Sequence, residues 1–191
     1  MNKKRKNVRN GVILLLVVLL GIGGAAFINR NDEPQPVLTQ ALAETTENGS
    51  EVFTMDFSNE PENVIYLAGG CFWGIEHLMA SIPGVIDAES GYANGRNPED
   101  ANYQTICSGD TGFRETVRVE YDPGQVSLDA LLMAYFYVID PTVQNRQGND
   151  IGTQYQTGVY YTNDAAKETV ERIAAIERSR SPEFHVEIGP L

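Results

Sequence analysis

Residues 64–81 read VIYLAGGCFWGIEHLMAS, which is a short apolar run followed by two glycines and a longer segment. The run Val64–Ala68 is typical of a buried strand, and the Gly69-Gly70 pair ends it. Apolar residues then recur at helical spacing, which predicts a helix over Phe72–Ser81. The stretch therefore predicts a strand, a tight turn and a helix, with Cys71 at the point where the helix begins.

Short strand-like runs and helical patterns continue to alternate along the rest of the chain. Further strands are predicted over Val85–Tyr92, Phe113–Tyr121, Thr157–Tyr161 and Phe184–Ile188, and further helices over Leu128–Val138 and from Asn163 or Asp164 to about Arg178. This order, β-α-β-β-α-β with an extra helix and strand, predicts an α+β fold, a two-layer ferredoxin-like (split βαβ) sandwich. Residues 93–110 and 140–156 exceed the usual connection length, and we expect them to be functional loops.

The amino-terminal segment, residues 1–30, differs from the rest in charge and hydropathy. It holds six Lys or Arg residues and no acid, and the stretch Gly11–Ile28 carries no charge. A basic flank before an apolar run of this length predicts a signal-anchor or transmembrane segment that leaves the flank in the cytoplasm. We expect a single membrane anchor with the folded domain outside the cytoplasm, in a bacterial periplasm or at the cell surface. Cleavage and secretion is the alternative.

Residues 31–62 are predicted to be a flexible exported linker, and residues 63–191 the folded domain. The linker shows no sustained apolar period and is interrupted by proline, glycine and acidic residues. Residues 31–191 hold eight Lys or Arg residues against 26 Asp or Glu residues. A segment with this excess of negative charge repels phosphate groups, which excludes nucleic acid as an expected partner. We expect the protein to be a monomer.

The chain contains only two cysteines, Cys71 and Cys107, and two histidines, His77 and His185. This set, without a Cys-x-x-Cys pair, disfavours a tetrahedral zinc site, and we expect no metal and no bound cofactor. A structural disulfide between the two cysteines is one interpretation in an exported chain.

A reactive thiol is the other interpretation of Cys71. Unpaired backbone N–H groups at the start of a helix favour a thiolate over a thiol, so this position predicts a nucleophile. Phe72 and Trp73 follow at once and would supply an apolar wall for an apolar ligand group. The alternative is that these two aromatic residues are core residues in the first turn of the helix.

A nucleophilic thiol is compatible with more than one chemistry. A cysteine hydrolase needs a histidine oriented by a third group, and the sequence offers no such arrangement. Attack on an electrophilic sulfur instead needs an acid and hydrogen-bond donors for the departing oxygen, and Glu115, Tyr103 and Tyr155 are of the right kinds. A carboxyl group buried among aromatic residues has a raised pKa. The alternative for Glu115 is a solvated strand residue, and for the tyrosines ordinary packing.

Motifs spread over residues 63–191 carry a resemblance to a known family. They are GCFWG (70–74), GY (91–92), Tyr103, CSGDTG (107–112), Glu115, YDP (121–123), DPT (140–142), NRQGND (145–150) and QY (154–155). Together they resemble the A-type peptide methionine sulfoxide reductases. This resemblance is more specific than any of the single motifs.

The resemblance implies a peptide-methionine (S)-S-oxide reductase, which repairs oxidised methionine in proteins or peptides outside the cytoplasm. It implies that Cys71 attacks the sulfoxide sulfur and becomes a sulfenic acid. Glu115 would protonate the sulfoxide oxygen. The implied substrate-binding residues lie around the methyl group (Phe72, Trp73) and on the polar side of the pocket (Tyr103, Asp150, Tyr155).

The second half of the reaction is implied less completely. In many relatives, cysteines near the carboxyl terminus resolve the sulfenic acid and a thioredoxin reduces the resulting disulfide. This sequence stops at Leu191 without such cysteines, so we expect either a truncated carboxyl terminus or another reductant. Cys107 is a possible resolving thiol, and direct attack by an external thiol, from a thioredoxin-like protein or dithiothreitol, is favoured. Phe113 and Ile139 stand where relatives usually have histidine.

One alternative comes from another functional class. The domain would then be a non-catalytic, membrane-tethered interaction module, and Cys71 and Cys107 would form a permanent disulfide.

Overall fold

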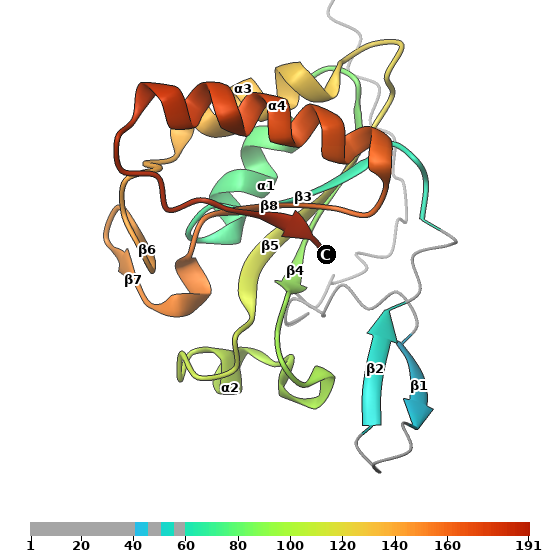
Figure 1. Ribbon diagram of the computed structural model, residues 1–191, viewed down its shortest axis with the longest axis vertical. Coiled ribbons are helices and arrows are strands. Elements are labelled where there is room, and N and C mark those ends of the chain that lie inside the picture. Colours follow the sequence, from blue (N-terminus) through green and yellow to red (C-terminus); the bar gives the residue numbers. More distant parts are fainter. Residues whose placement is uncertain (1–40, 46–50, 56–59) are drawn as a thin grey trace, which may run out of the picture. The chain divides into compact units, whose positions relative to one another are not determined.

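The computed structural model describes residues 41–45, 51–55 and 60–191. Its main sheet consists of β3 (Val64–Ala68), β4 (Val85–Ala93), β5 (Arg114–Tyr121), β8 (Gly158–Tyr161) and β9 (Glu187–Pro190). The spatial order of the strands is β4-β5-β3-β8-β9 (Figure 1). Neighbouring strands are antiparallel, except that β9 runs parallel to β8.

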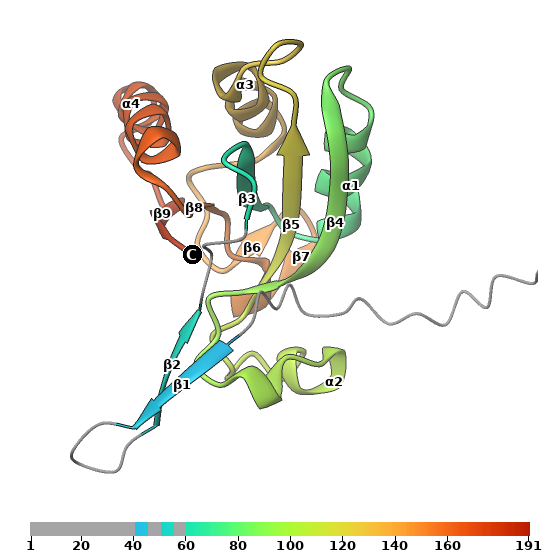
Figure 2. The same ribbon diagram turned by 90° about the vertical axis from the view of Figure 1, so that its right-hand side faces the viewer.

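Four α-helices and several shorter elements complete this part of the chain. The helices are α1 (Phe72–Ala80), α2 (Tyr103–Ile106), α3 (Leu128–Val138) and α4 (Asp164–Arg180). The shorter elements are the 3₁₀ helices η1 (Pro98–Asp100) and η2 (Thr153–Tyr155) and the strands β6 (Arg146–Gln147) and β7 (Asp150–Ile151). Figure 2 shows α2 at the opposite end of the domain from α1, α3 and α4.

The topology confirms the predicted α+β sandwich of the split βαβ kind. Helix α1 connects β3 to β4, and β5 lies between these two strands. Helix α3 connects β5 to β8, and β3 lies between them. The buried residues of α1, α3 and α4 join one apolar cluster with residues of the sheet, so the three helices cover the same face.

Strand β3 is the central strand, and all five of its residues are buried. Ile65 and Leu67 belong to the cluster under the helices. The alternate residues of β3 belong to a second cluster with Tyr160, because successive side chains of a strand point to opposite faces. Cys71 follows this strand after only two glycines, so the most deeply packed strand of the sheet holds the start of α1 in place.

Tyr135 of α3 adds a second anchor beside this turn. Its side chain is fully buried, and its hydroxyl donates a hydrogen bond to the carbonyl oxygen of Ala68 at 2.6 Å. The same hydroxyl lies 3.2 Å from the carbonyl oxygen of Gly158, where β8 begins. One side chain therefore ties the ends of two strands to the helical layer.

Most predicted bounds agree with the structure to within a residue or two, and the last strand does not. The prediction over Phe184–Ile188 is displaced, because β9 spans Glu187–Pro190. Phe184 instead packs under the guanidinium group of Arg178, at 4.7 Å from the ring centroid. The backbone of His185 bonds to other parts of the chain, which leaves it unavailable to the sheet.

The predicted linker contains regular structure that the prediction missed. Strands β1 (Ala41–Thr45) and β2 (Glu51–Met55) pair in antiparallel register. The Asn48-Gly49 pair between them in the sequence is a strong hairpin signal. The predicted membrane segment, residues 1–30, lies outside the described residues. Within residues 41–45, 51–55 and 60–191, no helix is long and apolar enough to cross a membrane.

Candidate active site

Cys71 stands at the amino-terminal end of α1, immediately before Phe72. The preceding Gly70 has a φ of +81°, and a β-carbon on it would lie 2.6 Å from Cβ of Gln147. Only glycine satisfies both the left-handed backbone and this close approach. Cys71 is half-buried and its thiol is free, as is the exposed thiol of Cys107. The structure therefore does not contain the disulfide that the interaction-module interpretation requires.

The surroundings of Cys71 act on its thiol in opposite directions. Burial raises the pKa of the thiol above its ordinary value. Backbone N–H groups of Trp73 and Gly74 lower the pKa, as the start of a helix should. The negative charges of Glu115 and Asp150 raise it. The net shift of the Cys71 pKa is upward, because desolvation outweighs the backbone donors. The prediction of a net preference for the thiolate at this position is therefore wrong.

Glu115 lies beside Cys71 and is almost completely buried, with 3% of its surface exposed. It occupies the same face of β5 as Val117 and Val119, two and four residues further on, which both belong to the cluster beneath the helices. The backbone N–H of Phe72 donates a hydrogen bond to Oε2 of Glu115 at 3.1 Å. The interpretation of Glu115 as a solvated strand residue is therefore wrong.

The protonation of Glu115 follows from this position. Burial raises its pKa to about 7, the charge of Asp150 contributes in the same direction, and the N–H of Phe72 opposes both. The carboxyl group therefore holds a proton in a substantial fraction of molecules near neutral pH. A general acid needs this property, and a surface carboxylate does not have it.

The two tyrosines approach Glu115 from different loops. Tyr103 begins α2, and its pKa is raised chiefly by a hydrogen bond with the Cys107 side chain, with smaller contributions from Glu115 and Cys71. Tyr155 ends η2, and its pKa is raised by burial and by the charges of Glu115 and Asp150. Tyr103 also contributes to that shift. The charge of Glu115 thus acts on both phenols, which come from different loops.

Phe72 and Trp73 have different environments. Phe72 is 3% exposed, and its ring packs against Tyr92 with 5.7 Å between the ring centroids. It is a core residue, as the alternative interpretation proposed. Trp73 is 67% exposed, with its ring centroid 6.0 Å from that of Phe72. An apolar surface next to Cys71 therefore comes from Trp73, supported from below by Phe72.

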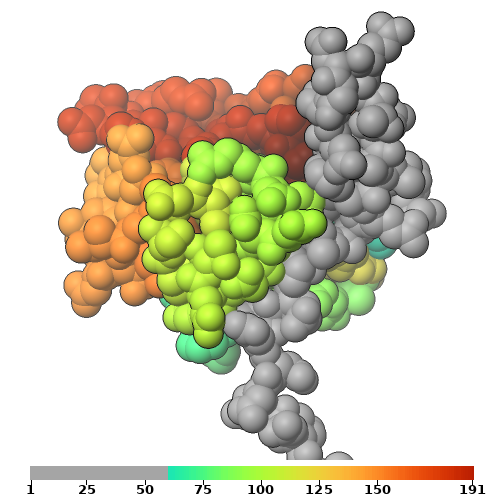
Figure 3. Space-filling model, turned by 90° about the horizontal axis from the view of Figure 1, so that it is seen from below, coloured from blue at the N-terminus to red at the C-terminus, as the bar shows by residue number. Residues whose placement is uncertain are grey.

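The long loops that carry Tyr103 and Tyr155 lie next to each other. Figure 3 shows the yellow-green segment around residues 95–112 beside the orange segment around residues 140–156. Asp150, the first residue of β7, is half-buried, and its charge acts on Cys71, Glu115 and Tyr155. One end of the domain therefore gathers a thiol, two carboxyl groups and two phenols.

Sequence reasoning missed residues that shape this site without reacting. Gln147 packs on Gly70, and its side-chain amide oxygen accepts a hydrogen bond from the Asp140 backbone at 3.0 Å. Gln156 is buried and accepts a hydrogen bond from the backbone N–H of Asn145 at 2.6 Å. The Gly69-Gly70 pair indicated that another part of the chain packs closely against this backbone, but it did not identify the side chain that does so.

The arrangement suits one class of chemistry. A thiol can attack an electrophilic atom while a neighbouring carboxylic acid protonates the departing group, and phenol hydroxyls can hold that group. Within residues 60–191, no three His, Cys, Asp or Glu side chains are grouped as metal ligands would be.

Comparisons with known proteins place the chain in a family. A family model described as peptide methionine sulfoxide reductase matches residues 63–191. The structure resembles methionine sulfoxide reductase A of Corynebacterium diphtheriae, with 33% sequence identity, a TM-score of 0.64, and coverage of 84% of this chain and 72% of that one. It also resembles Mxr1 from Saccharomyces cerevisiae in reduced form, with 35% identity, a TM-score of 0.62, and coverage of 66% and 75%.

Proposed function

The chain belongs to the peptide methionine sulfoxide reductase family, and we propose that Cys71 and Glu115 together reduce the S epimer of methionine sulfoxide. Family membership makes the protein a methionine sulfoxide reductase of the A type. The observation that carries the proposed mechanism is the placement of Glu115. Its carboxyl group is buried, bonded to the backbone N–H directly after Cys71, and has a pKa of about 7.

The proposed first step transfers the oxygen atom from substrate to enzyme. The sulfur of Cys71, as a thiolate, attacks the sulfoxide sulfur, and Glu115 donates a proton to the sulfoxide oxygen. The protonated oxygen then bonds to the Cys71 sulfur, while its bond to the substrate sulfur and the new bond between the two sulfur atoms both break. Methionine leaves as the thioether, and Cys71 becomes a sulfenic acid. Tyr103 and Tyr155 hold the oxygen, and Trp73, supported by the buried Phe72, contacts the methyl group.

The proposed second step returns Cys71 to the thiol. An external thiol attacks the sulfenic acid, which releases water and leaves a mixed disulfide. A second thiol then reduces this disulfide. A thioredoxin-like protein or dithiothreitol supplies both thiols. Cys107 is the internal alternative, supported by its exposed thiol and by Tyr103, which interacts with both cysteines.

The proposed location is the outer side of a membrane. The support is the basic flank and uncharged stretch of residues 1–30, read from the sequence. The substrates would then be oxidised methionines in exported proteins. If the full chain is released from membranes by alkaline carbonate, or if its domain is shielded from added protease in intact cells, this location is wrong.

The function is tested with the full chain and a peptide that contains one methionine sulfoxide. We expect dithiothreitol-dependent reduction of the S epimer and not of the R epimer. Cys71→Ser should abolish turnover, whereas Cys107→Ser should retain it. Equal activity of the wild type and Cys71→Ser would refute the mechanism.

A single turnover without reductant then identifies the resolving thiol. Mass spectrometry should find a sulfenic acid on Cys71, trapped by dimedone, if an external thiol completes the cycle. A Cys71–Cys107 disulfide and one released water would assign the second step to Cys107 instead.

A further inference from the structure

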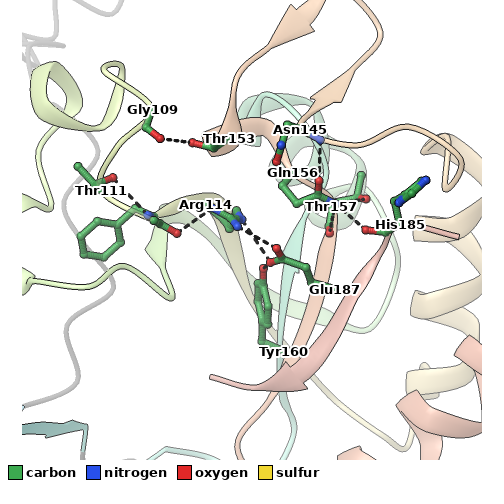
Figure 4. Close-up of polar contacts among 12 residues, drawn as sticks. Gly109, Thr111, Arg114, Asn145, Thr153, Gln156, Thr157, Tyr160, His185 and Glu187 are labelled. Carbon is green, nitrogen blue, oxygen red and sulfur yellow. Dashed lines mark hydrogen bonds and ion pairs between the residues drawn. The ribbon is translucent and has the colours of Figure 1, made fainter.

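The two long loops of the active site are joined by a hydrogen bond that the proposed mechanism does not use. The hydroxyl of Thr153 donates to the carbonyl oxygen of Gly109 at 2.6 Å (Figure 4). Thr153 begins η2, whose last residue is Tyr155. Gly109 lies just beyond α2, which carries Tyr103. Among residues 60–191, this is the one hydrogen bond between the two loops.

Gly109 is held firmly with respect to Tyr103. Its backbone N–H donates to the carbonyl oxygen of Ile106 at 2.9 Å, which closes the last turn of α2. Its φ of +80° then redirects the chain, a conformation typical of a glycine that ends a helix. The carbonyl group that Thr153 contacts is therefore part of the same local unit as Tyr103 and Cys107.

Thr153 is held equally firmly with respect to Tyr155. The backbone carbonyl of Thr153 accepts a hydrogen bond from the N–H of Gln156 at 3.1 Å. The Gln156 side chain in turn bonds to the backbone of Asn145 and of His185, each at 2.6 Å. The Thr153 hydroxyl therefore joins two units that each have hydrogen bonds of their own.

We propose that Thr153 is a positioning residue that sets the separation of Tyr103 and Tyr155 across the oxygen-binding pocket. This proposal rests on the proposed function, in which both phenols hold the sulfoxide oxygen. Each phenol arrives on its own loop, so their relative position depends on what connects the loops. Donors that are already in place stabilise a developing charge most strongly, and small displacements lower the rate steeply.

The matched variants are Thr153→Val, which keeps the shape and removes the hydroxyl, and Thr153→Ser, which keeps the hydroxyl. For reduction of the S-sulfoxide peptide, we expect Thr153→Val to lower kcat/KM about tenfold and Thr153→Ser to stay within about twofold of the wild type. Equal losses in both variants, or no loss in Thr153→Val, would overturn the proposal. Thr153→Ala serves as a second hydroxyl-free variant if Thr153→Val fails to fold.

A double-mutant cycle separates positioning from general stability. In the Tyr103→Phe background, one of the two positioned hydroxyls is already absent, so Thr153→Val should have a much smaller effect than in the wild type. Additive effects would show that Thr153 acts independently of Tyr103 and would refute the proposal.

Hydrogen exchange tests the bridge without reference to activity. Thr153→Val should speed amide exchange in residues 107–112 and leave α3 and α4 unchanged, while Thr153→Ser should match the wild type. If the wild type cannot reduce methionine sulfoxide, the proposed function fails on that result alone. Unchanged exchange in Thr153→Val would instead overturn the bridge itself.

Discussion

At the residue scale, Glu115 shows how burial and hydrogen bonding compete on one carboxyl group. The N–H of Phe72 stabilises the ionised form, and the loss of water around the side chain favours the protonated form. Burial dominates, which leaves the pKa about 7. The same burial raises the pKa of the neighbouring Cys71 thiol. The protonated form of Glu115 and the thiolate form of Cys71, which the proposed mechanism requires together, therefore predominate over different pH ranges.

Replacing Glu115 by glutamine should remove the acid while keeping an oxygen for the N–H of Phe72. We expect kcat to fall about 100-fold or more, because general acids contribute at least that factor. In the wild type, thiolate gained on raising the pH is offset by acid lost above about pH 7, so kcat/KM should rise with pH and level off there. In Glu115→Gln the rise should continue through pH 7. A matching plateau in the variant would contradict the assignment.

The charge of Glu115 should also be measurable at Cys71 without any substrate. Above pH 7 the ionised carboxylate opposes formation of the thiolate, so Glu115→Gln should lower the pKa of Cys71. At pH 8, iodoacetamide should then alkylate Cys71 several-fold faster in the variant, followed on its peptide by mass spectrometry. At pH 5, where Glu115 is protonated in the wild type, the two rates should agree.

Glu120→Gln is the control for this alkylation experiment. It removes a charge from the same strand, but Glu120 pairs with Arg118 at 3.2 Å. We expect it to leave the Cys71 rate unchanged at both pH values. If it accelerates alkylation as much as Glu115→Gln does, the effect belongs to net charge and not to the contact.

At the element scale, α3 and α4, the longest helices of the described residues, begin at polar caps. The Ser127 hydroxyl accepts from the Ala130 N–H at 3.3 Å, and the Asn163 side-chain oxygen accepts from the Ala166 N–H at 2.9 Å. The Asn163 amide also donates to the carbonyl oxygen of Glu62 at 3.0 Å. Asn163 therefore both starts α4 and binds the segment that leads into the sheet.

Asn163→Ala should lower the free energy of unfolding by about 1 kcal/mol, the usual effect of losing a helix cap. Asn163→Asp keeps the cap acceptor and loses only the bond to Glu62, so its effect should be smaller. Urea unfolding of both variants checks this order. Because Asn163→Ala loses both interactions, equal losses of stability in the two variants would show that the cap contributes nothing beyond the bond to Glu62.

These elements also show what can and cannot be predicted from the sequence. Periodicity and cap residues are local, and the predicted bounds of β3 and α3 agree with the structure. The burial of Glu115 was predictable, because Glu115 and Val117 are two residues apart on β5 and therefore point to the same face of the sheet. The bridge from Thr153 to Gly109 joins positions 44 residues apart, and no local pattern encodes such a distance. The place of β9 likewise depends on bonds that His185 makes elsewhere.

At the scale of the whole molecule, the last strand is attached through a polar cluster centred on Glu187. Arg114 of β5 donates to both carboxylate oxygens of Glu187, at 2.8 and 3.2 Å. Tyr160 of β8 donates its hydroxyl to the same carboxylate at 2.6 Å (Figure 4). Arg114 also bonds to the carbonyl oxygen of Gly112 at 2.8 Å. The cluster thus connects three strands and the end of one active-site loop.

Glu187→Ala should lower the free energy of unfolding by about 1–2 kcal/mol, because it leaves Arg114 and Tyr160 without their acceptor. We do not expect more, since 40% of the Glu187 side chain is exposed and water weakens the ion pair. Glu187→Gln keeps one acceptor oxygen and should lose less. Thermal or urea unfolding that finds both variants as stable as the wild type would show that β9 is held by its backbone bonds alone.

The exposed indole next to the Cys71 thiol gives the protein a built-in optical reporter. Trp73 is the only tryptophan in the 191 residues. Its fluorescence therefore arises from one place, beside Cys71, without a background from other indoles. A ligand that covers the Trp73 indole replaces water with apolar contacts and shifts the fluorescence emission toward the blue. Occupancy of the catalytic face can thus be followed in real time, without a label and without any chemical change.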